Sequence, residues 1–187
     1  MTKNRLLNIA TVLCKFTKGL FVLAFIGLTF LFIHIQIHRD YYKDKKVDFD
    51  TKDFTYSMTH KVKTKTADNA IFTVENIKTY SLYITYFQLT GLLAVLFLGT
   101  KEFQKVLESV KKVTTFEADN VTAFRRIGKL IFIYALLTSF SILEFNEGGF
   151  RGFSIPLKPL ILILLAFIMA EVFKEGHALK QENDLTI

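Results

Sequence analysis

The sequence predicts an all-α membrane protein with four transmembrane helices and a small extracellular β-hairpin between the first two helices. Residues 19–37 and 80–99 contain no Asp, Glu, Lys or Arg. A helix of roughly 20 apolar residues is long enough to cross the hydrocarbon core of a bilayer. Residues 127–143 and 155–173 are also apolar, and only three charges interrupt them: Lys129, Lys158 and Glu171. Such charges reach the interface when they lie near the ends of a span.

The composition agrees with this class and limits the number of domains. The chain of 187 residues is 51% hydrophobic, with 20 Phe and only two Pro, and its mean hydropathy is +0.32. These values exclude a disordered chain. Four spans leave too few residues for a second globular domain, so we expect one membrane domain over residues 1–187. Because Cys14 is the only cysteine, an intramolecular disulfide and a cysteine-based metal site are both excluded.

The distribution of Lys and Arg predicts the orientation. The segment before the first span is basic and has no acid, and the connection at residues 100–126 carries six basic residues. Because cytoplasmic segments retain Lys and Arg, we expect both termini, this connection and the tail at 174–187 to be cytoplasmic. The loop at 38–79 is then extracellular, although it carries nine basic residues against seven acids. Retention of Lys and Arg in the cytoplasmic segments accounts for the net charge of +7. Direct nucleic-acid binding is therefore not needed to explain the charge and is not expected.

The extracellular loop has the pattern of a β-strand. From Phe54 to Val62, aromatic and larger side chains at even positions alternate with polar side chains at odd positions. This two-residue period is typical of a strand with one covered face. Asp68 and Asn69 form a turn signal, and residues 70–74 are predicted to return as the second strand of the hairpin.

The cytoplasmic connection is predicted to extend the second and third helices beyond the bilayer. Apolar residues recur there at steps of three and four: Phe103, Val106, Leu107, Val110 and Val113. Residues 114–117 then match a capping box, and Asp119 and Asn120 are further helix-start residues. Two readings remain open, namely a helical hairpin packed on its own bundle and a docking face for a cytoplasmic partner.

Several polar residues are candidates for a metal site or for a functional acid. His34 and His38 share a helix face and are of the type that binds zinc or haem iron, but the sequence fixes no third ligand, so no metal and no cofactor are predicted. Glu171 is either an interfacial carboxylate paired with Lys174 or with Arg125 or Arg126, or a functional acid within a span.

A catalytic constellation is not recognisable in the sequence. The chain has no phosphate-binding glycine loop, nucleophile elbow or HExxH motif, so we expect that it is not an enzyme. The glycine-rich segment at 148–152 is interpreted as a turn with no further role. Gln88, Thr138 and Glu171 are the best candidates for a polar path through the membrane.

Two segments resemble a known family. These are AEVFKEGHALKQENDLTI at residues 170–187, and FEADNV at 116–121 leading into FRRIG at 124–128. They resemble a bacterial four-helix membrane family catalogued as a domain of unknown function, number twenty-nine seventy-five. Thr114 and Thr115 depart from the Pro-Phe turn expected there. The resemblance implies four spans in the bacterial inner membrane, both termini inside, no known reaction, and genes beside a helix-turn-helix regulator.

The leading hypothesis is therefore a non-enzymatic sensory or regulatory membrane protein that binds a cytoplasmic helix-turn-helix regulator. The candidate partner face comprises Phe103, Leu107, Phe116, Asn120, Arg125, Arg126, Glu171, Glu182, Asn183 and Asp184. One alternative is a small transporter or channel subunit, formed as a homo-oligomer. Another is an extracellular module that binds a peptide or senses envelope stress through residues 54–74. A metal-dependent enzyme ranks last.

Overall fold

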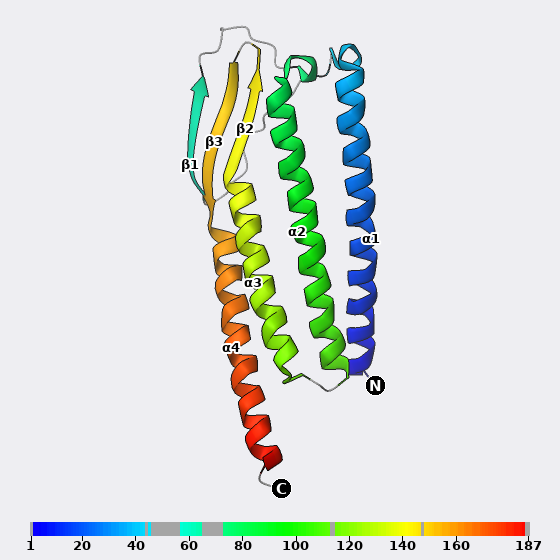
Figure 1. Ribbon diagram of the computed structural model, residues 1–187, viewed down its shortest axis with the longest axis vertical. Helices are drawn as coiled ribbons and strands as arrows, with labels where there is room; N and C mark the ends of the chain where they lie inside the picture. Colours follow the sequence, from blue (N-terminus) through cyan, green and yellow to red (C-terminus); the bar gives the residue numbers. More distant parts are fainter. Residues whose placement is uncertain are drawn as a thin grey trace. The chain divides into compact units, whose positions relative to one another are not determined.

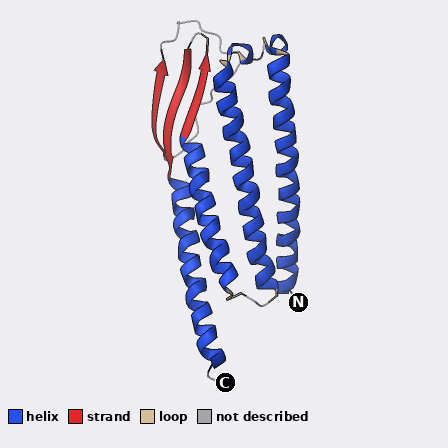
Figure 2. Cartoon of the chain, in the orientation of Figure 1, coloured by secondary structure: helices blue, strands red, loops and turns tan. Residues whose placement is uncertain are grey.

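The computed structural model describes residues 2–43, 45, 57–64, 73–112, 115–146 and 148–185. Within these residues the protein is mostly helical, with four α-helices, two short 3₁₀ helices and one three-stranded sheet (Figures 1 and 2). The elements in chain order are α1 (Thr2–Ile37), η1 (Arg39–Tyr42), β1 (Ser57–Thr64), η2 (Val74–Asn76), α2 (Thr79–Lys111), α3 (Ala118–Ser139), β2 (Phe140–Phe145), β3 (Gly148–Pro156) and α4 (Leu157–Leu185).

Two of the described helices are long and apolar enough to cross a membrane. They are Arg5–Ile37 of α1 and Thr79–Lys111 of α2, each 33 residues long. The protein buries 0% of the most apolar window of α1 and 6% of that of α2, whereas the core helix of a soluble protein is mostly buried. The predicted extension of the second helix beyond residue 99 is confirmed, because α2 continues without a break to Lys111.

The third helix ends before the end of the apolar segment 127–143 that predicted it. α3 ends at Ser139, and residues 140–145 form β2 instead of the last turn of a span. The side-chain amide of Gln88 donates hydrogen bonds to the carbonyl oxygens of Leu137, at 2.5 Å, and Phe140, at 2.6 Å. These bonds satisfy carbonyl groups that a helix end leaves without partners. The fourth helix likewise begins at Leu157, because Ile155 and Pro156 belong to β3.

The sheet has different partners from those predicted. β1 pairs antiparallel with β3, from Ser57 opposite Pro156 to Thr64 opposite Gly149, and β3 also pairs with β2, giving the order β1-β3-β2. The predicted strand in the first loop is therefore present, but its partner is the connection between α3 and α4. Residues 54–56 and 70–72 of the predicted hairpin lie outside the described residues, and Val74–Asn76 form η2.

The interpretation of residues 148–152 as a turn without a further role is wrong. They form the first half of β3, the central strand of the sheet. Gly148 has a φ of 153°, a conformation that glycine adopts far more readily than other residues. At Gly149, an added Cβ would lie 2.9 Å from the Cα of Glu144 and 2.9 Å from the carbonyl oxygen of Leu143. Glycine at these positions therefore permits the close approach of β2 and β3.

The chain divides into two compact units. Unit 1 comprises Met1–Val22, Ala94–Tyr134 and Lys158–Ile187, and unit 2 comprises Leu23–Leu93 and Ala135–Leu157. In unit 2, the buried side chains of Ile77, Leu82 and Phe145 form a small core. In unit 1, three small residues of α3 and α4 are buried: Ala123, Ala166 and Ala170. A Cβ on Gly128 would lie 3.1 Å from the ring of Phe167, which shows how closely these two helices pack.

Candidate functional site

The connection between α2 and α3 is held by the buried side chain of Asn120, which is 2% exposed. Its amide nitrogen donates to the hydroxyl of Ser109 at 2.7 Å and to the carbonyl oxygen of Thr115 at 2.6 Å. Its backbone N–H donates to the carbonyl oxygen of Glu117. Asn120 thus links the last turns of α2 to the first turn of α3. It supports the predicted partner face, although its own side chain is buried.

Replacing Asn120 with alanine is expected to lower the free energy of unfolding by about 1 to 3 kcal/mol. The hydroxyl of Ser109 and the carbonyl oxygen of Thr115 would lose the amide that donates to them. The buried thiol of Cys14, the only cysteine in the chain, provides the measurement. A fluorescent maleimide reacts with it as the detergent-solubilised protein unfolds on heating. The control is Thr122→Ala, because the exposed Thr122 hydroxyl donates only within α3, to Ala118. Equal unfolding midpoints for the two variants would contradict this role of Asn120.

Aromatic side chains join the α2–α3 connection to α4. The ring centroid of Phe173 lies 5.8 Å from that of Phe116 and 5.0 Å from that of Phe124. His177 bonds through Nδ1 to the carbonyl oxygen of Phe116 at 2.7 Å. A Cβ on Gly176 would lie 2.5 Å from Cε1 of Phe116, so the absence of a side chain at residue 176 permits this contact. Phe116 of the predicted face therefore lies against α4.

Ion pairs join the same helices. The carboxylate of Glu171 lies 3.0 Å from the guanidinium of Arg125 and 2.9 Å from the ammonium of Lys174. The expected pairing of Glu171 with Lys174 and with Arg125 is confirmed. Arg126 lies 3.7 Å from Glu102 of α2. The two pairs of Glu171 are exposed on both sides and contribute about 0 to 1 kcal/mol each, so they determine the positions of charges more than they stabilise the fold.

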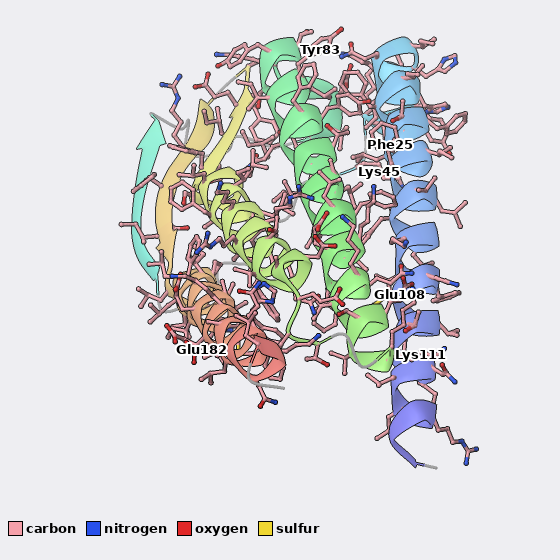
Figure 3. All side chains as sticks on the ribbon, turned by 60° about the horizontal axis from the view of Figure 1, so that its bottom comes forward. Phe25, Lys45, Tyr83, Glu108, Lys111 and Glu182 are labelled. Carbon is pink, nitrogen blue, oxygen red and sulfur yellow. The ribbon has the colours of Figure 1, made fainter. Side chains whose placement is uncertain are left out.

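A polar pocket of about 380 Å³ lies between the last turns of α2 and the first turns of α3. Its walls carry both signs of charge, and Figure 3 labels Glu108 on α2. Among the described residues, no three His, Cys, Asp or Glu side chains are placed to hold a metal ion. The charged residues that line the pocket are Glu102, Lys105, Glu108, Lys112, Glu117, Asp119 and Arg126. The pocket therefore presents charged groups of both signs on one surface.

The end of α4 extends past the contact between His177 and Phe116. Leu179 is 65% exposed and Leu185 is 87% exposed. Glu182 (labelled in Figure 3) and Asn183 are exposed on the same helix, while the side chain of Asp184 is outside the described part of the chain. The structure thus brings Phe116, Arg125 and Glu171 together between α3 and α4. It leaves Glu182 and Asn183 on the projecting helix end.

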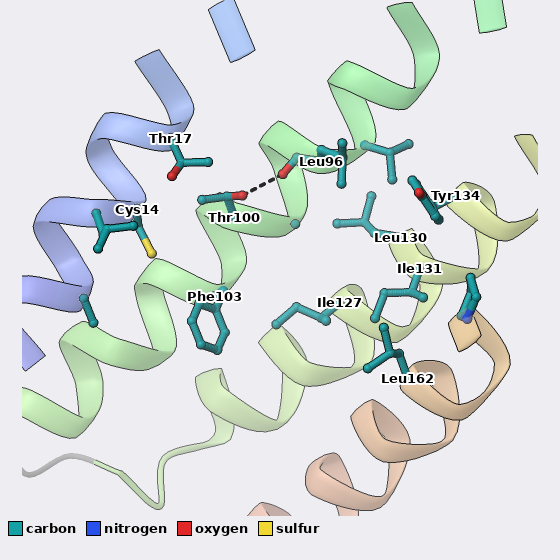
Figure 4. Close-up of a pocket in the computed structure, with 15 residues that line it drawn as sticks. Cys14, Thr17, Leu96, Thr100, Phe103, Ile127, Leu130, Ile131, Tyr134 and Leu162 are labelled. Atoms are coloured by element: carbon teal, nitrogen blue, oxygen red, sulfur yellow. Dashed lines mark hydrogen bonds between the residues drawn. The ribbon is translucent and has the colours of Figure 1, made fainter. Parts of the chain in front are cut away.

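An apolar groove of about 720 Å³ in unit 1 is lined by residues of all four helices (Figure 4). The side chains of Cys14 and Thr17 come from α1, and Phe103 of the predicted face comes from α2. Leu107, one turn further along α2, is half-buried. The sequence analysis missed this groove. Its one local signal is the stripe of α1 residues at helical spacing that forms one wall: Ala10, Leu13, Cys14 and Thr17.

A second cluster that the sequence analysis missed surrounds Glu144 in unit 2. Glu144 is 7% exposed and accepts hydrogen bonds from the hydroxyl of Tyr80, from Nε of Arg151 at 2.5 Å and from Nζ of Lys78 at 3.4 Å. The Tyr80 hydroxyl, followed by Arg151 and against the opposing effect of burial, lowers the pKa of Glu144 from 4.5 to about 2. The hydroxyl of Ser81 also accepts from the backbone N–H of Glu144. This cluster fastens β2 to the first turn of α2.

The stability of unit 2 is expected to depend on the ionisation of Glu144. Because folding lowers the pKa of this carboxyl, its stabilising effect is full above about pH 5 and is lost progressively as the pH falls towards 2. The thermal unfolding midpoint, followed by circular dichroism in detergent, should therefore fall over this range. In Glu144→Gln the fall should be smaller, because this side chain does not ionise. An identical acid dependence in both proteins would assign the loss of stability to other carboxyls.

The histidine pair His34 and His38 lies in an aromatic cluster at the end of α1. Nδ1 of His34 lies 2.9 Å from the hydroxyl of Tyr42, and the ring centroids of His34 and His38 are 5.1 Å apart. Tyr41 packs edge-on against His34, with ring centroids 5.9 Å apart. The described residues bring no third metal-ligating side chain to this pair, so its contacts are those of an aromatic cluster at the end of α1.

The candidates for a polar path each have local partners. Gln88 bonds the end of α3, as described above, and the hydroxyl of Thr138 donates to the carbonyl oxygen of Ala135 at 3.1 Å. Glu171 pairs with Arg125 and Lys174. These contacts give the three residues roles in packing that need no permeating ion.

The fold and these sites define a mostly helical protein with a small sheet and two helices able to cross a membrane. Residues 67–187, well over half of the chain, match the family described as "protein of unknown function (DUF2975)". The chain belongs to this family, which confirms the resemblance carried by its C-terminal segments. No curated protein matches the chain, and no solved structure matches it.

Proposed function

We propose that the protein is an integral membrane protein of the bacterial inner membrane in which α1, α2, α3 and α4 are all spans. The support for the last two spans is their exposed apolar surface. On α3, Phe132 is 51% exposed, and on α4, Ile161 and Leu164 are each 61% exposed. Water disfavours such extended apolar surface and lipid accepts it. The basic N-terminal segment and α2–α3 connection then place both termini on the cytoplasmic side.

Within this topology, the protein acts as a non-enzymatic regulator that binds a cytoplasmic helix-turn-helix protein. The observation that carries this proposal is the projecting end of α4. α4 contacts the α2–α3 connection through His177, and the helix continues to Leu185 and exposes Leu179. Docking of this helix end into a groove of the partner buries its exposed apolar side chains.

The experiment compares two leucines on the same helix. Leu179 is 65% exposed and Leu164 is 61% exposed, but only Leu179 lies on the projecting end. The detergent-solubilised protein is purified with the helix-turn-helix protein encoded beside it. Leu179→Ala is expected to weaken retention about tenfold, the loss of roughly 1.4 kcal/mol, and Leu164→Ala is expected to retain it fully. Absence of retention by the unmodified protein, or equal retention by both variants, would overturn the proposal.

A further inference from the structure

The apolar part of the third helix is too short to cross a bilayer by itself. It runs from Lys129 to Ser139, where α3 ends, and ten residues of helix rise only about 15 Å. The hydrocarbon core of a bilayer is about 30 Å thick. When α3 serves as a span, the segment that follows it has to cross the remaining half, and that segment is β2.

A hydrogen bond to α2 gives the depth at which β2 begins. The chain has no charged residue between Lys78 and Lys101. Gln88, which donates to the carbonyl oxygen of Phe140, is ten residues from Lys78 and thirteen from Lys101. These separations correspond to about 15 and 20 Å of helix. Because charged side chains mark the ends of a span, Gln88 and the start of β2 are far from both surfaces of the membrane.

A second set of contacts gives the depth at which β2 ends. Glu144 accepts hydrogen bonds from Lys78 and from the hydroxyl of Tyr80, so it is level with the first turn of α2. A strand rises about 13 Å over the four residues from Phe140 to Glu144. A helix rises about 12 Å over the eight residues from Tyr80 to Gln88. The two lengths agree, so β2 runs beside the first half of the uncharged segment of α2 (Figure 1).

The main chain of β2 is suited to lipid because α2 bonds the edge that does not face β3. In lipid, main-chain polar groups need partners within the protein. Every second residue of a strand bonds on the same side, and on this edge the residues are Phe140, Ile142 and Glu144. Gln88 donates to the carbonyl oxygen of Phe140 at 2.6 Å. The hydroxyl of Ser81 donates to the carbonyl oxygen of Ile142 at 3.2 Å and accepts from the N–H of Glu144 at 3.0 Å.

The side chains on this part of the hairpin are apolar and exposed. Phe140 is 51% exposed, and Phe153 and Ile155 of β3 are exposed as well. Phe140 and Phe153 are opposite each other, with ring centroids 5.4 Å apart, and Ile155 lies on the same face of the sheet. The adjoining helix ends also expose apolar side chains, at Leu136 and Leu157. The apolar surface of the helices therefore continues onto the hairpin.

Charge returns on β3 two positions before Phe153. Arg151 lies on the same face of the sheet as Phe153 and donates to the carboxylate of Glu144, at the level of Tyr80. Tyrosine and arginine side chains are typical of the membrane interface. The limit of the hydrocarbon core therefore falls between Phe153 and Arg151.

We propose that residues 140–142 of β2 and 153–156 of β3 lie in the outer leaflet of the membrane. There Phe140, Phe153 and Ile155 contact the acyl chains of phospholipids, and Arg151 lies at the headgroups. Depth identifies the occupant, because an exposed surface beside the uncharged segment of a span meets acyl chains and not water. The inference rests on the proposed membrane topology and is independent of the proposed regulator. It changes the expectation of an entirely extracellular hairpin.

The test measures the depth of single tryptophans. The chain contains no Trp, so one introduced Trp reports its own surroundings. The full chain is reconstituted in phosphatidylcholine vesicles with or without bromine atoms on the acyl chains, which quench indole fluorescence on contact. Phe140→Trp and, independently, Phe153→Trp are each expected to lose at least about half of their fluorescence in the brominated lipid. Acrylamide in the water should quench both only weakly.

Two control variants give the limits of the measurement. Phe132→Trp changes a residue of α3 that is 51% exposed, the same fraction as Phe140, and brominated lipid should quench it as strongly. Tyr41→Trp changes a residue of η1, beyond the end of α1, that is 72% exposed. Acrylamide should quench this variant strongly, and brominated lipid should quench it weakly.

The outcomes separate this inference from the proposed function. Lipid quenching of Phe132→Trp alone would overturn the inference and leave the topology in place, whereas quenching of none of the three would overturn both. Strong quenching of Phe140→Trp by acrylamide would show that the hairpin lies in water. Protection of Phe140→Trp and Phe153→Trp from both quenchers would make a second copy of the chain the occupant. Loss of the regulator with lipid quenching intact would contradict only the proposed function.

Discussion

Replacing Phe145 with alanine is expected to lower the free energy of unfolding of unit 2 by about 3 to 5 kcal/mol, the usual cost of removing a buried phenylalanine. Phe145 is 1% exposed and packs against Ile77 and Leu82 in the core of this unit. It also forms an isolated β-bridge with Ile77, the residue that precedes α2 by two positions. Its removal leaves a cavity at the point where β2, η2 and α2 meet.

Hydrogen exchange of the β2 amides, followed by mass spectrometry, measures this loss as faster exchange of residues 140–145. The matched control is Phe140→Ala, the same substitution at the other end of the same strand. Phe140 is 51% exposed and contacts Phe153 with ring centroids 5.4 Å apart, so its replacement should cost about 1 kcal/mol or less. Similar exchange in the two variants would show that the stability of unit 2 does not depend on the core at Phe145.

Replacing Gly149 with alanine is expected to cost about 3 kcal/mol, at the upper end of the range for overpacking. The added Cβ would lie 2.9 Å from two backbone atoms, the Cα of Glu144 and the carbonyl oxygen of Leu143. These backbone atoms belong to a paired strand, so they cannot move away from the added Cβ as the flexible end of a side chain could. The strain is relieved by parting β2 from β3, which also withdraws Glu144 from Tyr80 and Arg151.

Limited trypsin digestion provides the measurement, because parting these strands exposes the bond after Arg151 of β3. The control is Gly152→Ala, at which an added Cβ would lie 2.6 Å from the hydroxyl oxygen of Ser141. That hydroxyl is a side-chain group and is able to rotate away, so cleavage after Arg151 should remain slow. If Gly149→Ala is also cut slowly, the close approach of the two strands at this position is not needed for their pairing.

The sequence predicted the helices well because their apolar periodicity is long. The extension of α2 follows from the spacing of its apolar residues, and the beginning of α3 follows from helix-start residues such as Asp119 and Asn120. The strands were harder, because a short apolar run is compatible with a buried strand and with the end of a helix. Residues 140–143 were therefore assigned to a span. Their conformation depends on pairing with β3 and on the hydrogen bonds from Gln88, and neither partner is local in the sequence.

The candidate site was predicted only in part, because some of its contacts also join residues that are far apart in the sequence. The pairing of Glu171 follows from charges of opposite sign near the ends of neighbouring helices. The burial of Asn120 and the cluster around Glu144 depend on contacts between segments far apart in the chain, for which residue patterns give no signal. The apolar groove cannot be predicted from periodicity alone. Each helix that lines it has an apolar stripe, and such a stripe is equally typical of ordinary helix packing or of contact with lipid.

The pairing of β1 with β3 has a consequence for the order of events during synthesis. The paired residues are 85 positions apart in the sequence for Thr64 and Gly149 and 99 positions apart for Ser57 and Pro156. At a translation rate of about 5 to 20 residues per second, β1 leaves the ribosome some 5 to 18 s before its partner exists. For that interval its main-chain donors and acceptors have no β3 to bind. The nascent chain thus completes this sheet only after the third helix has been made, and a chain terminated before residue 148 has no route to it.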